Sequence, residues 1–365
     1  MTRSRKKASW AIVLLLFLLT PLFWSTTKLN KVERRWPLQK WNSGIMQVIL
    51  LAHKSEEELH LIANSAYLEV GKLDQVINDY DPKSEAGRLR LAMEKGQKNI
   101  IVSKELFGLI KFATQVSCAS SGAFDITVEP LIKLWKACTK QKHLPDKKQI
   151  QAAKAMVGWQ KISLKAKTIP THSGEIAACQ IFQISIQSPI SINLGAFSKG
   201  YAVDQIVKFL MQQKISAGMV NMGGDLCCFG KKSWKIGIQD PRISNANAPA
   251  KIMGIISVKN KAIATSGDYR RYTEIAGKRY SHIIDPRSGQ PVPHSIVSVT
   301  VVANQAMIAD AYATALCVLP AEEGIKLAEH HHLDALIICQ IKKKYFMHQT
   351  PGFKRLWEDK PNWVQ

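Results

Sequence analysis

The sequence lacks the residue patterns that mark several common protein classes. No two of its seven cysteines have the spacing of a zinc site or a redox motif; they stand at positions 118, 138, 179, 227, 228, 317 and 339. No internal repeat of solenoid length is present. An odd number of cysteines leaves at least one free even after export, and most lie in apolar contexts where a buried thiol is expected. The cysteines therefore receive no chemical role.

Acidic residues are also scarce. The chain has 28 Asp and Glu against 50 Lys and Arg, a formal net charge of +22. Such an excess is typical of proteins that meet nucleic acid, an anionic membrane surface or phosphorylated ligands. No zinc-finger spacing and no aromatic-rich basic repeat occurs, so we expect no nucleic-acid partner. A membrane surface and a phosphorylated ligand remain.

What the chain does have is the composition of a folded protein with a targeting segment. Its 365 residues, 46% hydrophobic and 21% charged, are enough for one large or two modest domains. Four basic residues within 3–7 precede an apolar run over 8–24, which predicts export with the amino terminus in the cytoplasm. No small-x-small cleavage site and no lipid-accepting cysteine follows this run. We expect residues 1–25 to be a signal peptide or, preferably, an uncleaved membrane anchor.

Helical and strand patterns alternate irregularly along the remaining chain, which favours the α+β class. Ser55 and Glu58 have capping-box spacing and open a long amphipathic helix, and Ser103 opens a second one. Residues 28–40 are basic and irregular, as in a linker. Strands are expected at 45–52, 191–194, 215–222, 251–258, 262–266 and 297–303, and a hairpin over 336–348.

A glycine-bearing turn at 195–200 links the strand expected at 191–194 to a helix. Free amides at a helix amino end favour an anion, and Lys199 adds a positive charge. The turn is neither a Walker loop nor a GxGxxG fingerprint, so it could equally be structural. Further along, Asp310 and Thr314 stand at i and i+4 and therefore share one side of a predicted helix. Hard oxygen ligands of this kind suit Mg²⁺, although a packed helix with a salt-bridged aspartate is also consistent.

Six motifs in order are more specific than any one of them. They are SGAFD at 121–125, NLGAFSKGYA at 193–202, NMGGD at 221–225, TSGDYRR at 265–271, YSHIIDP at 280–286 and DAYAT at 310–314. On these motifs the chain resembles the ApbE family of FAD:protein FMN transferases. The resemblance covers most of the chain and divides it into a leader (1–25), a linker (26–41), one transferase domain (42–350) and a carboxyl-terminal tail (351–365).

The resemblance implies an exported α+β enzyme that binds FAD as substrate and Mg²⁺ as cofactor. Such enzymes attach FMN to a threonine hydroxyl of a partner protein through a phosphoester and release AMP. For this chain it implies a nucleotide site lined by Tyr80, Ala123, Phe124, Asp125, Asn193, Lys199 and Ile284. It implies Mg²⁺ ligation by the Ala196 carbonyl, Asp310 and Thr314, with Ala313 adjacent. The acceptor would be a membrane or periplasmic redox subunit, and the enzyme would lie at the periplasmic face of the inner membrane.

The residues also suggest which side chains could transfer protons. His282 and Asp285 are our candidates for proton transfer or for orienting the acceptor threonine, with Asp268 as a third; a structural His-Asp turn is the alternative. The chain departs from the family pattern at Asn193, where aspartate is common, near Arg90, where asparagine is usual, and at 42–46. Two other functions stay open: an FAD pyrophosphatase, and a non-catalytic flavin-binding assembly factor of a membrane redox complex.

Overall fold

A computed structural model describes residues 29–38, 44–169, 179–242, 251–267, 272–275, 278–293, 295–342 and 344–361. The leader expected at 1–25 lies outside this part of the chain. Within the described ranges, no helix combines the length and apolar character needed to cross a bilayer.

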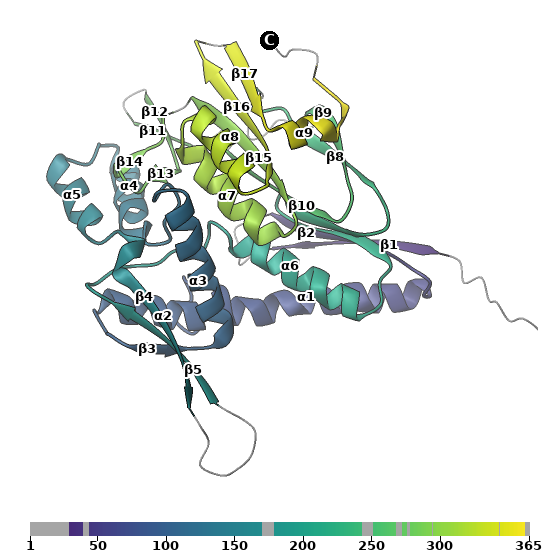
Figure 1. Cartoon of the computed structure of the whole chain (residues 1–365), viewed down its shortest axis with the longest axis horizontal. Coiled ribbons are helices and arrows are strands. Elements are labelled where there is room, and N and C mark those ends of the chain that lie inside the picture. Colours follow the sequence, from purple (N-terminus) through teal and green to yellow (C-terminus); the bar gives the residue numbers. More distant parts are fainter. Residues whose placement is uncertain are drawn as a thin grey trace, which may run out of the picture.

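Eight antiparallel strands form the central sheet, which Figure 1 shows running through the molecule. Their order is β1 (Asn30–Pro37), β2 (Ile45–Ala52), β6 (Ala217–Met222), β7 (Asp225–Gly230), β10 (Lys261–Gly267), β15 (Ile296–Ala303), β16 (Asp334–Ile341) and β17 (Lys344–Gln349). Every residue of β15 is buried, which explains its nearly continuous run of β-branched and apolar residues. The sheet is thus covered on both faces.

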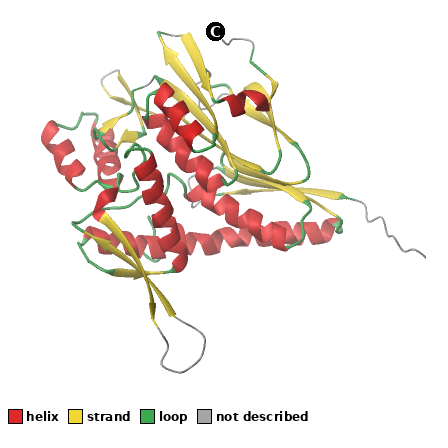
Figure 2. Ribbon diagram, in the orientation of Figure 1, coloured by secondary structure: helices red, strands yellow, loops and turns green. Residues whose placement is uncertain are grey.

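One face of the sheet is covered by helices (Figure 2). These are α1 (Glu56–Ile77), α6 (Ser198–Gln212), α7 (Ala306–Val318) and α8 (Ala321–His330). The other face packs against a smaller sheet, ordered β18 (Trp357–Asp359), β9 (Ile252–Val258) and β8 (Trp234–Gln239), and against α9 (Pro351–Leu356). The resulting layers leave the amino end of α6 and the middle of α7 side by side.

A second lobe stands beside this body, on the left in Figure 1. It contains α2 (Glu85–Glu94), α3 (Lys104–Ala119), α4 (Glu129–Gln141), α5 (Lys147–Ala155), a 3₁₀ turn at Trp159–Lys161 and the sheet β3 (Ile100–Val102), β5 (Cys179–Ile186), β4 (Ile162–Ile169). Two small hairpins pair β11 (Tyr272–Ile275) with β12 (Lys278–Ser281) and β13 (Ile284–Asp285) with β14 (Gln290–Pro291).

The expected α+β class with mixed sheets and flanking helices is confirmed. The capping box of Ser55 and Glu58 is present at α1, and Ser103 caps α3. Three expectations were wrong. Residues 30–37 are the edge strand β1 rather than part of an irregular linker. Residues 191–194 are extended but lie in no sheet. The expected tail folds from 351 to 359 as α9 and β18.

Candidate functional site

The carboxylate predicted to hold a metal is buried where α6 and α7 cross. Asp310 on α7 is 4% exposed, and its Oδ2 accepts a hydrogen bond of 3.1 Å from the backbone amide of Gly200. The helices approach closely because residue 200 has no side chain: a Cβ there would lie 2.3 Å from the Ala306 carbonyl oxygen. Burial, followed by the nearby negative charge of Asp225, raises the pKa of Asp310 to about 8. A cation beside Asp310 would reverse that effect.

Thr314 lies one helical turn beyond Asp310 and faces the turn before α6. Its Oγ1 donates to the carbonyl oxygen of Ala196 at 3.5 Å and lies 3.4 Å from Oγ of Ser266 on β10. Ala313, named beside these ligands, is fully buried. The structure therefore joins the hydroxyl and the carbonyl of the predicted set, 118 residues apart in the chain, beside the helix that carries the carboxylate.

Lys199 is held by Asp225, the last residue of the NMGGD motif, for which the sequence predicts no role. Its Nζ donates to Oδ2 of Asp225, which is 2% exposed and begins β7 directly after the Gly223-Gly224 turn. Burial raises the pKa of Asp225, and the positive charge of Lys199 opposes that shift. The contact with Asp225 thus holds the Lys199 ammonium group at the amino end of α6.

A partly buried carboxylate on α6 fixes the start of α7. Asp204 on α6 accepts hydrogen bonds from the first two amides of α7, 2.7 Å to Ala306 and 2.9 Å to Met307. Burial raises the pKa of Asp204 to about 6. Because α7 has no capping side chain at Gln305, this contact from α6 replaces the ordinary cap.

The predicted nucleotide residues Tyr80 and Asn193 meet in one network. Asn193 Nδ2 donates to the Tyr80 hydroxyl at 2.8 Å and to Oε2 of the buried Glu129 at 2.6 Å. The Tyr80 residue is 56% exposed, so its ring is accessible to a planar ligand. The departure at 193 is therefore accommodated: an amide can donate to Glu129, whereas an aspartate would face a second carboxylate.

Asp79 lies next to this network with an unsatisfied oxygen. It is 3% exposed; Oδ1 accepts from the Leu194 amide at 3.3 Å, whereas Oδ2 has no hydrogen-bond partner. Burial raises the pKa of Asp79 to about 6. Arg90, the second departure from the family pattern, donates from Nε to the Asp79 carbonyl at 2.7 Å and pairs with Glu94 at 2.9 Å. Arg90 therefore has a structural role in this loop.

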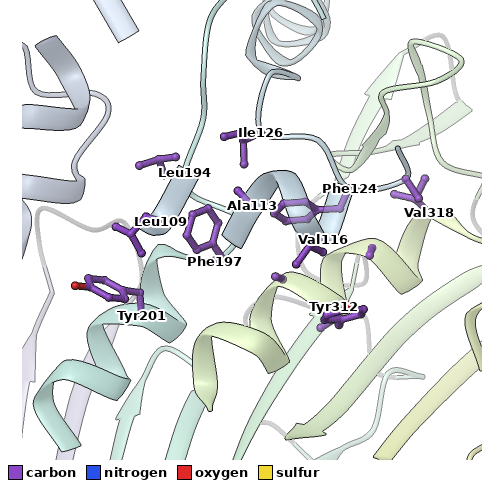
Figure 3. Packing of buried hydrophobic residues seen from close by; sticks show 14 of the residues in the cluster. Leu109, Ala113, Val116, Phe124, Ile126, Leu194, Phe197, Tyr201, Tyr312 and Val318 are labelled. Carbon is purple, nitrogen blue, oxygen red and sulfur yellow. The ribbon is translucent and has the colours of Figure 1, made fainter. Parts of the chain in front are cut away.

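The SGAFD motif provides support rather than exposed side chains. Figure 3 shows Phe124 and Phe197 together in the core between α3 and α7, and their ring centroids are 6.2 Å apart. Ala123 and Phe124 are each 2% exposed. Asp125 accepts from the Thr127 amide and hydroxyl at 2.8 and 2.7 Å and from the Trp159 amide at 3.0 Å. The motif can meet a ligand through its backbone, while Asp125 ties the turn to the second lobe.

The HIIDP turn packs against α4. His282 is exposed, and Ile284 is buried against Leu131 and Trp135. Both oxygens of Asp285 accept from the Arg287 guanidinium at 3.0 Å. That pairing favours the structural alternative for Asp285, whereas the role of His282 stays a prediction for an exposed side chain. Asp268 lies outside the described residues.

The donor set around α7 fits a hard divalent cation. One buried carboxylate, one hydroxyl and one backbone carbonyl are the oxygen ligands that Mg²⁺ prefers. No three His, Cys, Asp or Glu side chains gather as a metal cluster in the described part of the chain. Sequence reasoning missed Asp79, Glu129, Asp204 and Asp225 as parts of the site; only Asp225 lay within a quoted motif, whereas the others are recognised by their burial and contacts alone.

Known proteins match this chain along most of its length. A profile described as "ApbE family" matches residues 44–337. The FAD:protein FMN transferase of Vibrio cholerae is 29% identical over 349 residues, 87% of this chain and 98% of the relative. That of Escherichia coli is 31% identical over 287 residues, 77% of each protein.

Solved structures of ApbE proteins are also similar to this chain. The apo flavinyl transferase ApbE of Pseudomonas stutzeri has a TM-score of 0.73 and 27% identity, covering 90% of this chain and 97% of the other. The flavin transferase ApbE from Vibrio cholerae has a TM-score of 0.72 and 25% identity, covering 90% and 100%.

Proposed function

The chain belongs to the ApbE family, and from that premise we propose that it moves FMN from FAD onto a threonine hydroxyl of a partner protein in a Mg²⁺-dependent reaction that releases AMP. It is a transferase, and its curated relatives are named FAD:protein FMN transferase. The observation that supports the finer proposal is that Thr314 donates to the Ala196 carbonyl while Asp310, one turn earlier on α7, accepts from the amide of Gly200, the residue after Lys199.

In this proposal the cation is held by Asp310, Thr314 and the Ala196 carbonyl. When bound, Mg²⁺ neutralises charge on the pyrophosphate oxygens. Lys199, oriented by Asp225, adds a second positive charge at the amino end of α6, where backbone amides favour a phosphate. The exposed Tyr80 ring offers a stacking surface, and the Asn193–Glu129 pair fixes its hydroxyl.

The group transfer breaks one bond and forms another. The threonine oxygen attacks the FMN phosphorus, the bond from that phosphorus to the bridging oxygen breaks, and AMP leaves with the bridging oxygen. The threonine proton goes to a base, and His282 is our candidate because its side chain is exposed in the HIIDP turn. If His282→Ala transfers FMN at the unchanged rate, His282 has no part in the step.

We also propose an exported enzyme at the periplasmic face of the inner membrane, with a membrane or periplasmic redox subunit as acceptor. The basic and apolar pattern of residues 3–24 supports export. Tryptic peptide mapping of the membrane-associated protein would identify the mature amino terminus, and a chain confined to the cytoplasm would contradict this part of the proposal.

The metal site is tested by removing one ligand at a time. With FAD and MgCl₂, Asp310→Asn should lower AMP release at least about 100-fold, because the ligand's charge is lost. Thr314→Ala should raise the Mg²⁺ concentration needed for half-maximal rate. Thr139→Ala is the matched control, since Thr139 also donates to a carbonyl, that of Trp135 at 2.8 Å, but on α4.

Protein-bound flavin fluorescence in denaturing gels, with mass spectrometry of the modified threonine, separates transferase from pyrophosphatase. AMP and FMN released without any flavinylated protein in host extracts would favour the pyrophosphatase. Failure to bind FAD with Mg²⁺ would contradict both enzymes, and binding without cleavage would favour the assembly factor. Wild-type rates in Asp310→Asn would refute the metal site.

A further inference from the structure

The two helices of the second lobe that lie nearest the HIIDP turn carry an unbalanced positive charge. Residues 129–155 contain seven lysines, at 133, 136, 140, 142, 147, 148 and 154, and two acidic residues. Of these two acids, Glu129 is 2% exposed and accepts from Asn193, so Asp146, which caps α5 by accepting from the Gln149 amide, is the one that lies at the surface among the lysines. We call these seven residues the α4–α5 lysine face.

The lysines of α4 stand on the side that does not pack. Lys133, Lys136 and Lys140 have the i, i+3, i+7 spacing of one helix face. The opposite face buries Leu131, Trp135 and Cys138. Lys133 pairs with Glu94 at 3.2 Å; none of the other six lysines forms an ion pair with any residue that the structure describes. The charge is therefore available to a partner.

The lysines at the start of α5 are placed against local electrostatics. Lys147 and Lys148 occupy the first turn, where the helix dipole favours acidic residues, and their acidic neighbour at this helix end is the N-cap Asp146. Both lysines are exposed. The single charge of Asp146 does not balance the two lysines, so a net positive charge remains for a negatively charged partner.

The helices that carry the lysine face pack against the segment that contains the HIIDP turn. Trp135 of α4 donates from Nε1 to the Gly289 carbonyl at 2.9 Å, and its ring lies 5.7 Å from that of Tyr280. Ile284 and Ala153 of α5 join the same small core. Lys154 of α5 lies against the same segment, because a Cβ at Gly289 would be 3.3 Å from Lys154 Cδ. A partner on the α5 lysines would therefore lie next to the segment 280–289, which includes His282, whereas the α4 lysines stand on the other side of α4.

We propose that the α4–α5 lysine face is the docking surface for the acceptor protein, and that this protein carries acidic residues beside its target threonine. The inference rests on the proposed transferase function and adds the chemistry of its partner. Figure 1 places α5 and β1 at opposite ends of the molecule. A leader preceding β1 would hold the membrane at that other end, which favours a protein partner over the bilayer for this face.

The test uses the full chain and two labelled peptides that share one threonine core, one flanked by glutamates and one by glutamines. Binding is measured by fluorescence anisotropy at low and high salt. Wild type should bind the glutamate peptide about tenfold more tightly, and salt should remove the preference. Lys136→Glu/Lys140→Glu/Lys147→Glu should abolish that preference, while cleavage of FAD without acceptor stays at the wild-type rate.

The matched control reverses three exposed lysines elsewhere: Lys208→Glu/Lys231→Glu/Lys259→Glu. It changes the net charge equally and should keep the preference. Equal binding of both peptides by wild type, or equal loss in both triple variants, overturns the inference. The inference is also overturned if wild type shows no preference between the peptides but binds phosphatidylglycerol vesicles through the same lysines. A wild type that discriminates the peptides but never cleaves FAD would instead contradict the proposed function.

Discussion

Buried aspartates are the residues that most distinguish this site. Asp79, Asp225 and Asp310 are each at most 5% exposed, and Asp204 is largely buried beneath α7. Burial raises the pKa of all four. A native fold keeps such groups only if something offsets their desolvation, here Lys199 for Asp225 and, in our proposal, a cation for Asp310.

Asp79 gives a prediction about stability and pH. Its folded-state pKa of about 6 is above the unfolded value of 3.8, so its contribution is fully present below pH 3.8 and is lost as pH rises through about 6. The loss is at most about 3 kcal/mol, from roughly two pKa units. Asp79→Asn should therefore gain stability relative to wild type as pH rises from 4 to 7.

Urea unfolding of both proteins across that pH range measures the difference. A constant difference between the two free energies of unfolding would show that Asp79 does not titrate in this range.

At the same scale, spacing alone indicated only residues whose partners are close in the chain, whereas distant ones such as Ala196 and Asn193 came from the family resemblance. Asp310 and Thr314 were predicted together because helical spacing places them on one side. Glu129 and Asp204 could not be predicted, because their partners Asn193 and Ala306 are distant in sequence. Asp225 sat in a quoted motif, yet its pairing with Lys199 depends on how β7 meets α6.

At the scale of elements, the crossing of α6 and α7 sets the geometry of the site. Gly200→Ala would place a methyl group 2.3 Å from the Ala306 carbonyl, so the helices must separate. We expect a loss of about 1–3 kcal/mol in stability and weaker Mg²⁺ activation, because the Gly200 amide also binds Asp310.

Gly71→Ala on α1 is the control, since nothing lies within 4 Å of a Cβ there. It should raise stability by about 0.5–1 kcal/mol. Denaturant unfolding and Mg²⁺ titration of AMP release measure both variants. Equal effects of the two substitutions would mean that α6 and α7 are not in close contact.

Elements with local start signals were predictable, and those defined by distant partners were not. Ser55 and Ser103 marked α1 and α3 correctly. The apolar residues of segment 191–194 made it resemble a buried strand in the sequence. Its amides instead donate to Asp79 and to the Ile126 carbonyl, so the segment joins no neighbouring strand. The strand β1 was missed because its edge position tolerates the charged residues of a linker.

At the scale of the whole molecule, the carboxyl-terminal residues close the core rather than trail from it. Phe353 of α9 is fully buried between the central sheet and the β8–β9 layer. Phe353→Ala should cost about 3–5 kcal/mol in stability, whereas Lys354→Ala, at an exposed neighbour, should cost less than about 0.5 kcal/mol. Thermal unfolding checks this, and an unaffected midpoint in Phe353→Ala would contradict the packing.

The α+β class and the family could be predicted at this scale because the ordered motifs and the mixture of helical and strand periodicities can be recognised without knowledge of contacts. The eight-strand order could not be derived, since β10 lies between β7 and β15 through pairings set by long-range burial.

The spread of the site along the chain also has a consequence for how the protein comes into being. Its contributors run from Asp79 to Thr314, so a nascent chain that has completed α1 to α5 has neither the carboxylate nor the hydroxyl with which to capture a metal. If the proposed function holds, magnesium and FAD therefore cannot assist the early stages of folding. They would bind only once the fold is nearly complete, and would then stabilise it against unfolding.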